Sequence, residues 1–264
     1  MKNAARIQAR WRWPALLGLH LLAGILLLSW ISPAGQAVWR DAGQSLFLTL
    51  NGSLGHNLVW DMFWALLSTR LWDSLVGILM LALLLHPAWV FRGAESRRAL
   101  FHVLALMLLL ITLRTLFAKL VGHMHWQHAS PSMLLPEAYR LSDAFPRLEH
   151  VFEVKDRSSR SFPGDHASVL FVWGLFMACF CRGWKLLASL ALVLLCTLPR
   201  LIAGAHWLED VAVGGVLLAA LAFAWGYCTP LASLIAAGLE RLSRPLLPWL
   251  RRLPLIGRMD ALED

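Results

Sequence analysis

Long apolar runs separated by short polar segments dominate this chain. A helix needs about 20 apolar residues to cross the hydrocarbon core of a bilayer. The shorter stretch 55–68 is rich in Trp and Leu but carries Asp61, so it predicts an interfacial helix, with a seventh span as the alternative. We therefore expect an all-α integral membrane protein, a bundle of six transmembrane helices with a periplasmic loop and an interfacial helix. The expected spans cover about 13–32, 71–90, 99–121, 162–181, 186–203 and 211–235.

The composition agrees with a lipid environment. Hydrophobic residues make up 58% of the 264 positions, charged residues only 15%, and the mean hydropathy is +0.60. Because soluble chains carry about 25% charged residues, this chain has too few polar groups to cover a globular surface. We expect a single polytopic membrane domain over residues 1–264. The first apolar run also resembles a signal peptide, but its length favours an uncleaved span.

The charge balance indicates how the chain is oriented in the membrane. Lys and Arg number 24 against 16 Asp and Glu, a net charge of +8, and in a membrane protein this excess does not call for a nucleic-acid partner. Cytoplasmic segments are enriched in Lys and Arg. The pattern predicts cytoplasmic termini, a basic cytoplasmic tail on membrane lipids over 239–264, and a loop on the outer face over 122–161, which the resemblance described below places in the periplasm. Fourteen basic residues fall in 1–13, 92–98, 182–185 and 239–264, and seven fall in the longer 33–70 and 122–161.

One polar cluster near the outer face combines Arg200, His206 and Asp210. A charge such as Arg200 at the end of an apolar span is costly and usually functional. His206 and Asp210 are four residues apart, so on a helix they share one face. A carboxylate that holds one imidazole nitrogen fixes the tautomer and leaves the other nitrogen free to attack. The spacing predicts His206 as a nucleophile that Asp210 orients.

A second cluster precedes the fourth apolar run. Lys155, Arg157 and Arg160 come before Pro163, which suits the first turn of a helix, and His166 follows. Cations and the free N–H groups of a helix N-terminus together form a site for phosphate. His166 would stand beside that site and donate a proton to a leaving group. The predicted topology brings both clusters to the same outer face.

Other classes of function remain open at this point. His123, His125 and His128 have a spacing compatible with metal ligation, although no nearby carboxylate or Cys completes the set. A transporter is another alternative, with Arg114 and Lys119 lining a path. A structural protein that uses its 14 Trp as membrane-interface belts is a third, but it leaves the two polar clusters unexplained.

At these residues the sequence resembles the type 2 phosphatidic acid phosphatase superfamily. That family carries Lys-x6-Arg-Pro, then Pro-Ser-Gly-His, then Ser-Arg-x5-His-x3-Asp. The third motif appears here as Pro199-Arg200, His206 and Asp210, with Pro in place of Ser. The second appears at 163–166, where Gly164-Asp165 replaces Ser-Gly. The first departs from the pattern, because Lys119 is followed seven residues later by Trp126-Gln127 instead of Arg-Pro.

The resemblance implies a mechanism without metal or other cofactor. It implies that His206 becomes phosphohistidine, that Asp210 orients it and that His166 protonates the leaving group. Arg200 would hold the phosphate oxygens, and Gly164 and Asp165 belong to the phosphate-binding motif. Either Lys119 also binds phosphate, or Lys155 and Arg160 have replaced it, which is the interpretation we favour.

A closer resemblance is to the lipid A 1-diphosphate synthases of Gram-negative inner membranes, carried by residues 155–166 and by Ala205 and Trp207 around the third motif. It implies transfer of phosphate from undecaprenyl diphosphate, the donor, to lipid A 1-phosphate, the acceptor, on the periplasmic face. The alternative is hydrolysis of undecaprenyl diphosphate or another lipid phosphate. Arg140 and Arg147 in the 122–161 loop form a possible acceptor platform, with a solvated loop as the simpler interpretation.

Overall fold

The computed structural model describes residues 7–87 and 89–246, and within these ranges the chain is helical, with an isolated bridge between Thr69 and Val154 and no strand. The predicted all-α class is confirmed. In chain order the α-helices are α1 (Trp13–Ile31), α2 (Pro33–Asn51), α3 (Leu58–Leu67), α4 (Arg70–Leu85), α5 (Ala94–His123), α6 (Pro131–Leu134), α7 (Leu141–Ala144), α8 (Pro146–Phe152), α9 (Asp165–Phe180), α10 (Trp184–Ile202), α11 (Val216–Tyr227) and α12 (Leu231–Ser243), and a π-helical turn, Asp210–Gly215, precedes α11.

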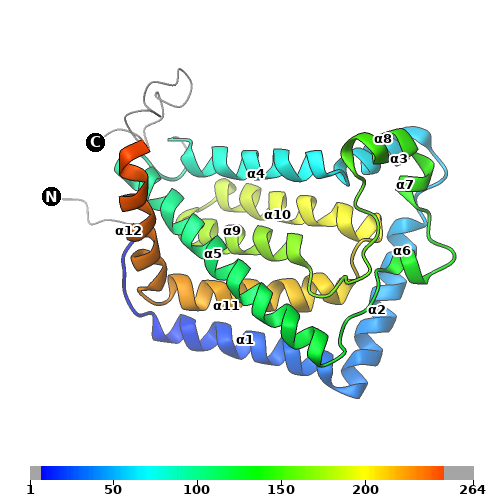
Figure 1. Cartoon of the computed structure of the whole chain (residues 1–264), viewed down its shortest axis with the longest axis horizontal. Helices are drawn as coiled ribbons and strands as arrows, with labels where there is room; N and C mark the ends of the chain where they lie inside the picture. The colour runs from blue at the N-terminus through cyan, green and yellow to red at the C-terminus, as the bar shows by residue number, and fades with distance from the viewer. Residues whose placement is uncertain (1–6, 88, 247–264) are drawn as a thin grey trace.

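The long helices α1, α4, α5, α9, α10 and α11 form the body of the molecule and run in similar directions, with α5 inclined across them (Figure 1). Within the described residues, four helical segments are long and apolar enough to cross a membrane: α1, α5, α10 and the continuous helix Asp210–Tyr227. This confirms the membrane-like character of the fold. The six-span count stays a prediction, because α4 and α9 have only 16 residues each.

The last predicted span, 211–235, is two helices instead of one. Tyr227 ends α11, and α12 begins at Leu231 directly after Pro230. Proline has no N–H to continue a helical hydrogen-bond ladder, which makes it a natural point for the break. After the break, α12 lies across one end of the bundle and packs on α5 (Figure 1). Of the predicted basic tail, residues 247–264 lie outside the described residues.

Helix α2 was not predicted, because its polar positions interrupt the apolar pattern. Pro33 occupies its first turn, and the Ser32 side chain accepts a hydrogen bond from the Gly35 N–H at 3.1 Å, a standard N-cap. At its other end, buried Asn51 donates to the carbonyls of Tyr139 and Ile202, both at 3.0 Å. Helix α2 therefore crosses the bundle at the end opposite α12 (Figure 1) and is fixed there to α10 and to the 122–161 loop.

The same end of the molecule carries α3 and the 122–161 loop, which contains α6, α7 and α8 (Figure 1). Helix α3 confirms a helix within the stretch 55–68. Its ten residues reach about 15 Å, half the hydrocarbon thickness, so it suits an interfacial position and is too short for a seventh span. Residues 155–161 are held between two elements: the Lys155 N–H donates to Ser68 O at 2.7 Å, and the Ser161 N–H donates to His128 O at 3.0 Å.

Candidate active site

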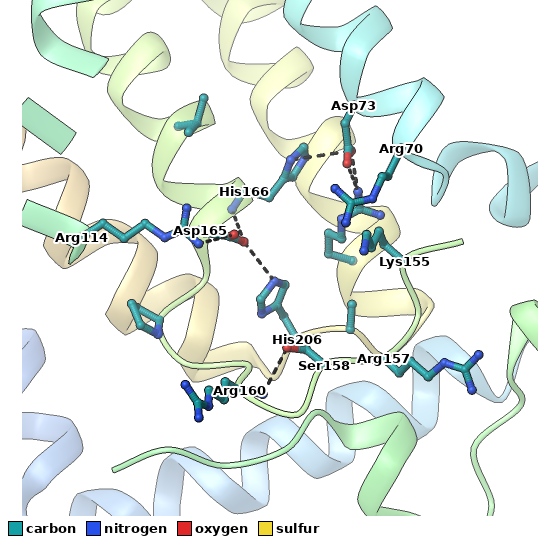
Figure 2. A pocket seen from close by; sticks show the side chains of 14 residues that line it. Arg70, Asp73, Arg114, Lys155, Arg157, Ser158, Arg160, Asp165, His166 and His206 are labelled. Atoms are coloured by element: carbon teal, nitrogen blue, oxygen red, sulfur yellow. Dashed lines mark hydrogen bonds and ion pairs between the residues drawn. The ribbon is translucent and has the colours of Figure 1, made fainter. Parts of the chain in front are cut away.

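A cavity of about 350 Å³ opens at this end of the bundle, between α4, α9, α10 and the 155–163 segment. Both histidines of the predicted site, His166 and His206, line it, and Figure 2 shows them on either side of the Asp165 carboxylate. The two sequence clusters therefore meet in one cavity. Among the residues that the structure describes, its charged lining consists of Arg70, Arg114, Lys155, Arg157, Arg160 and Arg200 with Asp73 and Asp165. This excess of cations suits a phosphate or diphosphate group.

His206 stands where the chain leaves α10. Gly204 makes the turn at a φ of +80°, and a Cβ there would lie 2.7 Å from the Phe47 ring, so the turn requires glycine. The His206 Nδ1–H donates to Ser161 O at 3.0 Å, and the same nitrogen lies 3.4 Å from Asp210 Oδ2. Because Nδ1 carries the proton, the neutral ring presents the Nε2 lone pair, which faces Asp165 Oδ1 at 3.7 Å.

The protonation of His206 is set by these two carboxylates. Burial by itself lowers the pKa of the imidazole, but hydrogen bonding and charge from Asp165 and Asp210 outweigh it and raise the pKa to about 9. His206 is only 8% exposed, so water screens these charges weakly. In the free protein the ring holds a proton at neutral pH, and it must lose that proton before Nε2 can attack.

Asp210 is fully buried, and its carboxylate accepts hydrogen bonds from two groups in addition to its contact with His206. Its Oδ2 accepts the Trp207 N–H at 2.8 Å, and its Oδ1 accepts the His128 Nε2–H at 2.9 Å. Burial lowers the pKa of His128, but the bond to Asp210 more than compensates and raises it. The sequence alone offers His128 as a metal ligand together with His123 and His125, and does not indicate a contact with Asp210. Among the described residues, no three His, Cys, Asp or Glu side chains form a metal-binding group.

Arg200 and His166 share a partner to which the sequence alone assigns no role, Asp73 on α4. The buried Arg200 guanidinium contacts both Asp73 carboxylate oxygens at 2.5 Å and donates to Ser68 O at 2.9 Å. His166 Nδ1 lies 3.7 Å from Asp73 Oδ1, and its Nε2–H donates to the Cys196 carbonyl at 3.2 Å. His166 Nδ1 is therefore the ring atom that can carry a proton toward the cavity.

The start of α9 is engaged by protein groups. The Gly164 N–H donates to Asp210 O at 2.9 Å, and the His166 N–H donates to the Asp165 carboxylate at 2.8 Å. The expected anion site at this helix end is thus partly filled by Asp165 itself. Asp165 also accepts a hydrogen bond from Arg114 at 2.7 Å, so Asp165 positions a cation as well as facing His206. The negative charge of Asp165 disfavours its direct contact with phosphate.

The cation from α5 is Arg114, one of the residues that lines the cavity; Lys119 is exposed and does not line it. The sequence alone offers Arg114 only as part of a transport path. A charge inside an apolar run is nevertheless the signal that indicates a functional residue at this position. Lys155 and Arg160, the favoured replacements, both line the cavity. Lys155 pairs with Glu153, which also pairs with Arg70, and these two contacts lower the pKa of Glu153 to about 2.

Comparison with known proteins supports the resemblance that the motifs indicate. Residues 136–233 match the model of the PAP2 superfamily. The chain is also similar to Lipid A 1-diphosphate synthase of Escherichia coli (strain K12), with 26% identity over 219 residues, 83% of this chain and 89% of the relative. No solved structure matches. The suspected relationship, to the superfamily and within it to the lipid A 1-diphosphate synthases, is confirmed at the level of similarity.

Proposed function

From this similarity to the PAP2 superfamily, we propose that the chain is an inner-membrane phosphotransferase that moves a phosphate from undecaprenyl diphosphate to lipid A 1-phosphate through a phosphohistidine. Activity as a lipid phosphatase or phosphotransferase is supported by the family match and by the name of the relative. One observation carries the proposal: His206 has Nδ1 held by protein and Nε2 directed into a cation-lined cavity that also holds His166.

The first half-reaction follows from that geometry. His206, once neutral, attacks phosphorus with the Nε2 lone pair, so an N–P bond forms as the bond to the bridging oxygen breaks. His166, protonated at Nδ1, gives its proton to the departing lipid phosphate oxygen. Arg200 and the other cations of the cavity offset the charge that gathers on the phosphoryl oxygens. Asp210 keeps the Nδ1 proton in place, so the ring holds one orientation throughout.

In the second half-reaction a phosphate oxygen of the acceptor attacks the phosphohistidine. The N–P bond breaks, a new diphosphate forms and the Nε2 lone pair of His206 is restored. His166 takes up the proton that the attacking group loses and is ready for the next turnover. Hydrolysis differs only in that water attacks. Because both outcomes use the same intermediate, the acceptor's access to the cavity decides between transfer and hydrolysis.

The test is a label-transfer assay. Purified full-length protein is incubated with undecaprenyl diphosphate labelled in its terminal phosphate, with and without lipid A 1-phosphate. We expect label on lipid A when the acceptor is present, and an acid-labile protein phosphate that is lost in His206→Ala. Label released only as inorganic phosphate in both reactions would reject the transferase in favour of the phosphatase. Excess chelator is expected to leave the reaction unchanged.

A further inference from the structure

A second cavity, of about 470 Å³, lies beside the one described above and has no role in the chemistry proposed for His206. Trp207, Glu209 and His128 line it, whereas His206 lines the first cavity. His128 donates a hydrogen bond to one oxygen of the Asp210 carboxylate, and His206 Nδ1 lies 3.4 Å from the other. A molecule in the second cavity would therefore contact a histidine that is linked through one carboxylate to the candidate nucleophile.

One wall of this cavity is the polar face of α2. Gln36, Arg40 and Gln44 line it and are spaced four residues apart, so they lie along a single face of the helix. Gly43 on the same helix is buried, and a Cβ there would lie 2.7 Å from the Glu209 carboxylate. The glycine allows the Glu209 side chain to lie directly against α2.

The cavity contains polar atoms that lack partners among the described residues. Glu209 is 7% exposed, and its Oε2 has no hydrogen-bond partner there. Burial, together with the charge of Asp210, raises the pKa of Glu209 to about 7, so this carboxyl group is protonated in part of the molecules and can donate or accept. Gln127, which also lines the cavity, has a buried Oε1 without a partner in the same described set. Buried polar atoms of this kind usually have a partner, and here a ligand can supply it.

The two cavities differ in charge, and this difference indicates different ligands. The first is lined by six Lys or Arg side chains against two carboxylates, whereas the second, among the described residues, has Arg40 opposite Glu209 and otherwise mainly amide, imidazole and aromatic groups. Amides and a carboxyl group offer both donors and acceptors without net charge, and aromatic walls suit the apolar faces of a ring. Trp30 and Trp207 are the tryptophans that line the second cavity among the described residues.

We propose that the second cavity binds a sugar ring, the uncharged and hydroxyl-rich head group of a membrane glycolipid, while phosphate groups occupy the first cavity. This inference deepens the proposed function and rests on it in one respect, namely that the acceptor is a glycolipid. A sugar is available either as a lipid head group or free in solution. The two sources share the same hydroxyl chemistry, and the experiment separates them.

The probe is radiolabelled lipid A from which both phosphates have been removed, so that the cation-lined cavity cannot hold it through phosphate. Full-length protein is placed in nanodiscs of phosphatidylethanolamine and phosphatidylglycerol, and equilibrium binding is measured without any donor. We expect saturable binding that weakens about tenfold or more in the double variant Gln36→Leu/Gln44→Leu, the effect of losing one or two hydrogen bonds. Gln8→Leu is the matched control, because Gln8 is exposed and does not line the cavity.

The source of the sugar is tested by competition with a free disaccharide of N-acetylglucosamine, which carries no charge. Displacement of the labelled lipid shows that the ring itself is recognised, whereas retention of all label at saturating disaccharide overturns the proposal. Equal binding by the double variant and the unmodified protein also overturns it. Because the probe carries no phosphate, loss of label transfer with intact sugar binding would reject the proposed transferase and leave this site standing.

Discussion

At the scale of single residues, His206 is held between Asp165 and Asp210, and this arrangement makes activity depend on pH. With its pKa raised to about 9, the neutral and nucleophilic form of His206 grows as the pH rises toward that value. Because the reaction also needs a proton on His166, we expect a bell-shaped profile of kcat/KM for the donor, in which one limb reports the His206 pKa near 9. Asp165→Asn removes one of the carboxylates that stabilise the imidazolium, so that limb should move to lower pH.

A pH–rate profile for both proteins checks this shift. Asp143→Asn is the control, because Asp143 is an exposed carboxylate on α7 outside the cavity, and its profile should match that of the unmodified protein. An unmoved profile in Asp165→Asn would mean that another group titrates.

His128 provides a second prediction at this scale. Its hydrogen bond holds the buried carboxylate that in turn contacts His206. His128→Ala should slow phosphohistidine formation about tenfold or more, since a hydrogen bond to a charged group is worth about 1.5–3 kcal/mol. His128→Gln keeps an N–H donor and should retain most of the rate. Rapid-quench measurement of the phosphoenzyme tests both, and equal losses in the two variants would assign His128 a packing role.

The sequence predicted His206 and Asp210 together because four residues separate them, but it did not predict their partners. His128 and Asp73 reach the site from segments more than 80 residues away from the side chains they contact, so no local spacing marks them. Arg114 was visible as a charge in an apolar run, yet only packing decides whether a helix directs such a side chain into the cavity. The sequence is sufficient to predict contacts between residues a few positions apart, whereas contacts between distant elements can be identified only from the folded structure.

At the scale of elements, the start of α9 meets the π-helical turn Asp210–Gly215 almost backbone to backbone. A Cβ at Gly164 would lie 2.7 Å from the Asp210 carbonyl oxygen, which leaves no space for a methyl group. Such π-turns often occur at functional sites, and this one places Asp210. Gly164→Ala should displace Asp210 and lower the rate of phosphohistidine formation about tenfold or more, because small misplacements of catalytic groups are costly.

Gly77→Ala is the matched control for this substitution. Gly77 lies in α4, where a Cβ would meet nothing within 4 Å, so the change should leave activity unaltered and slightly stabilise the helix. Thermal unfolding is measured alongside the rate. A Gly164→Ala protein with unaltered rate and unaltered melting temperature would show that the two elements can separate without consequence.

Other features of the fold show where apolar pattern is a limited guide. The runs located α1, α5 and α10 well, because each of these helices contains an apolar window long enough to cross a membrane. Helix α2 escaped prediction, since Gln36, Arg40 and Gln44 give it a polar face that lines a cavity instead of meeting lipid. The run 211–235 merged two helices, because leucines and alanines continue on both sides of the break at Pro230.

At the scale of the whole molecule, the site and the start of α1 lie at opposite ends of the bundle, and α12 lies near the start of α1 (Figure 1). The distribution of Lys and Arg predicts that the end with α12 faces the cytoplasm and that the site faces the periplasm. Two exposed positions report the two faces: Asp143 on α7, at the site end, and Arg182 in the turn between α9 and α10, at the other end.

Each position is replaced by cysteine, Asp143→Cys or Arg182→Cys, in a variant whose four native cysteines are alanine. A maleimide that cannot cross the inner membrane is then added to cells with a permeabilised outer membrane. We expect labelling at position 143 while the inner membrane is intact, and at position 182 only after the inner membrane is opened. The opposite labelling pattern would mean that the protein has the inverted orientation in the membrane, with the cation-lined cavity facing the cytoplasm. Because the proposed acceptor reaction is periplasmic, that result would also remove the physical basis for transfer to lipid A at the outer face.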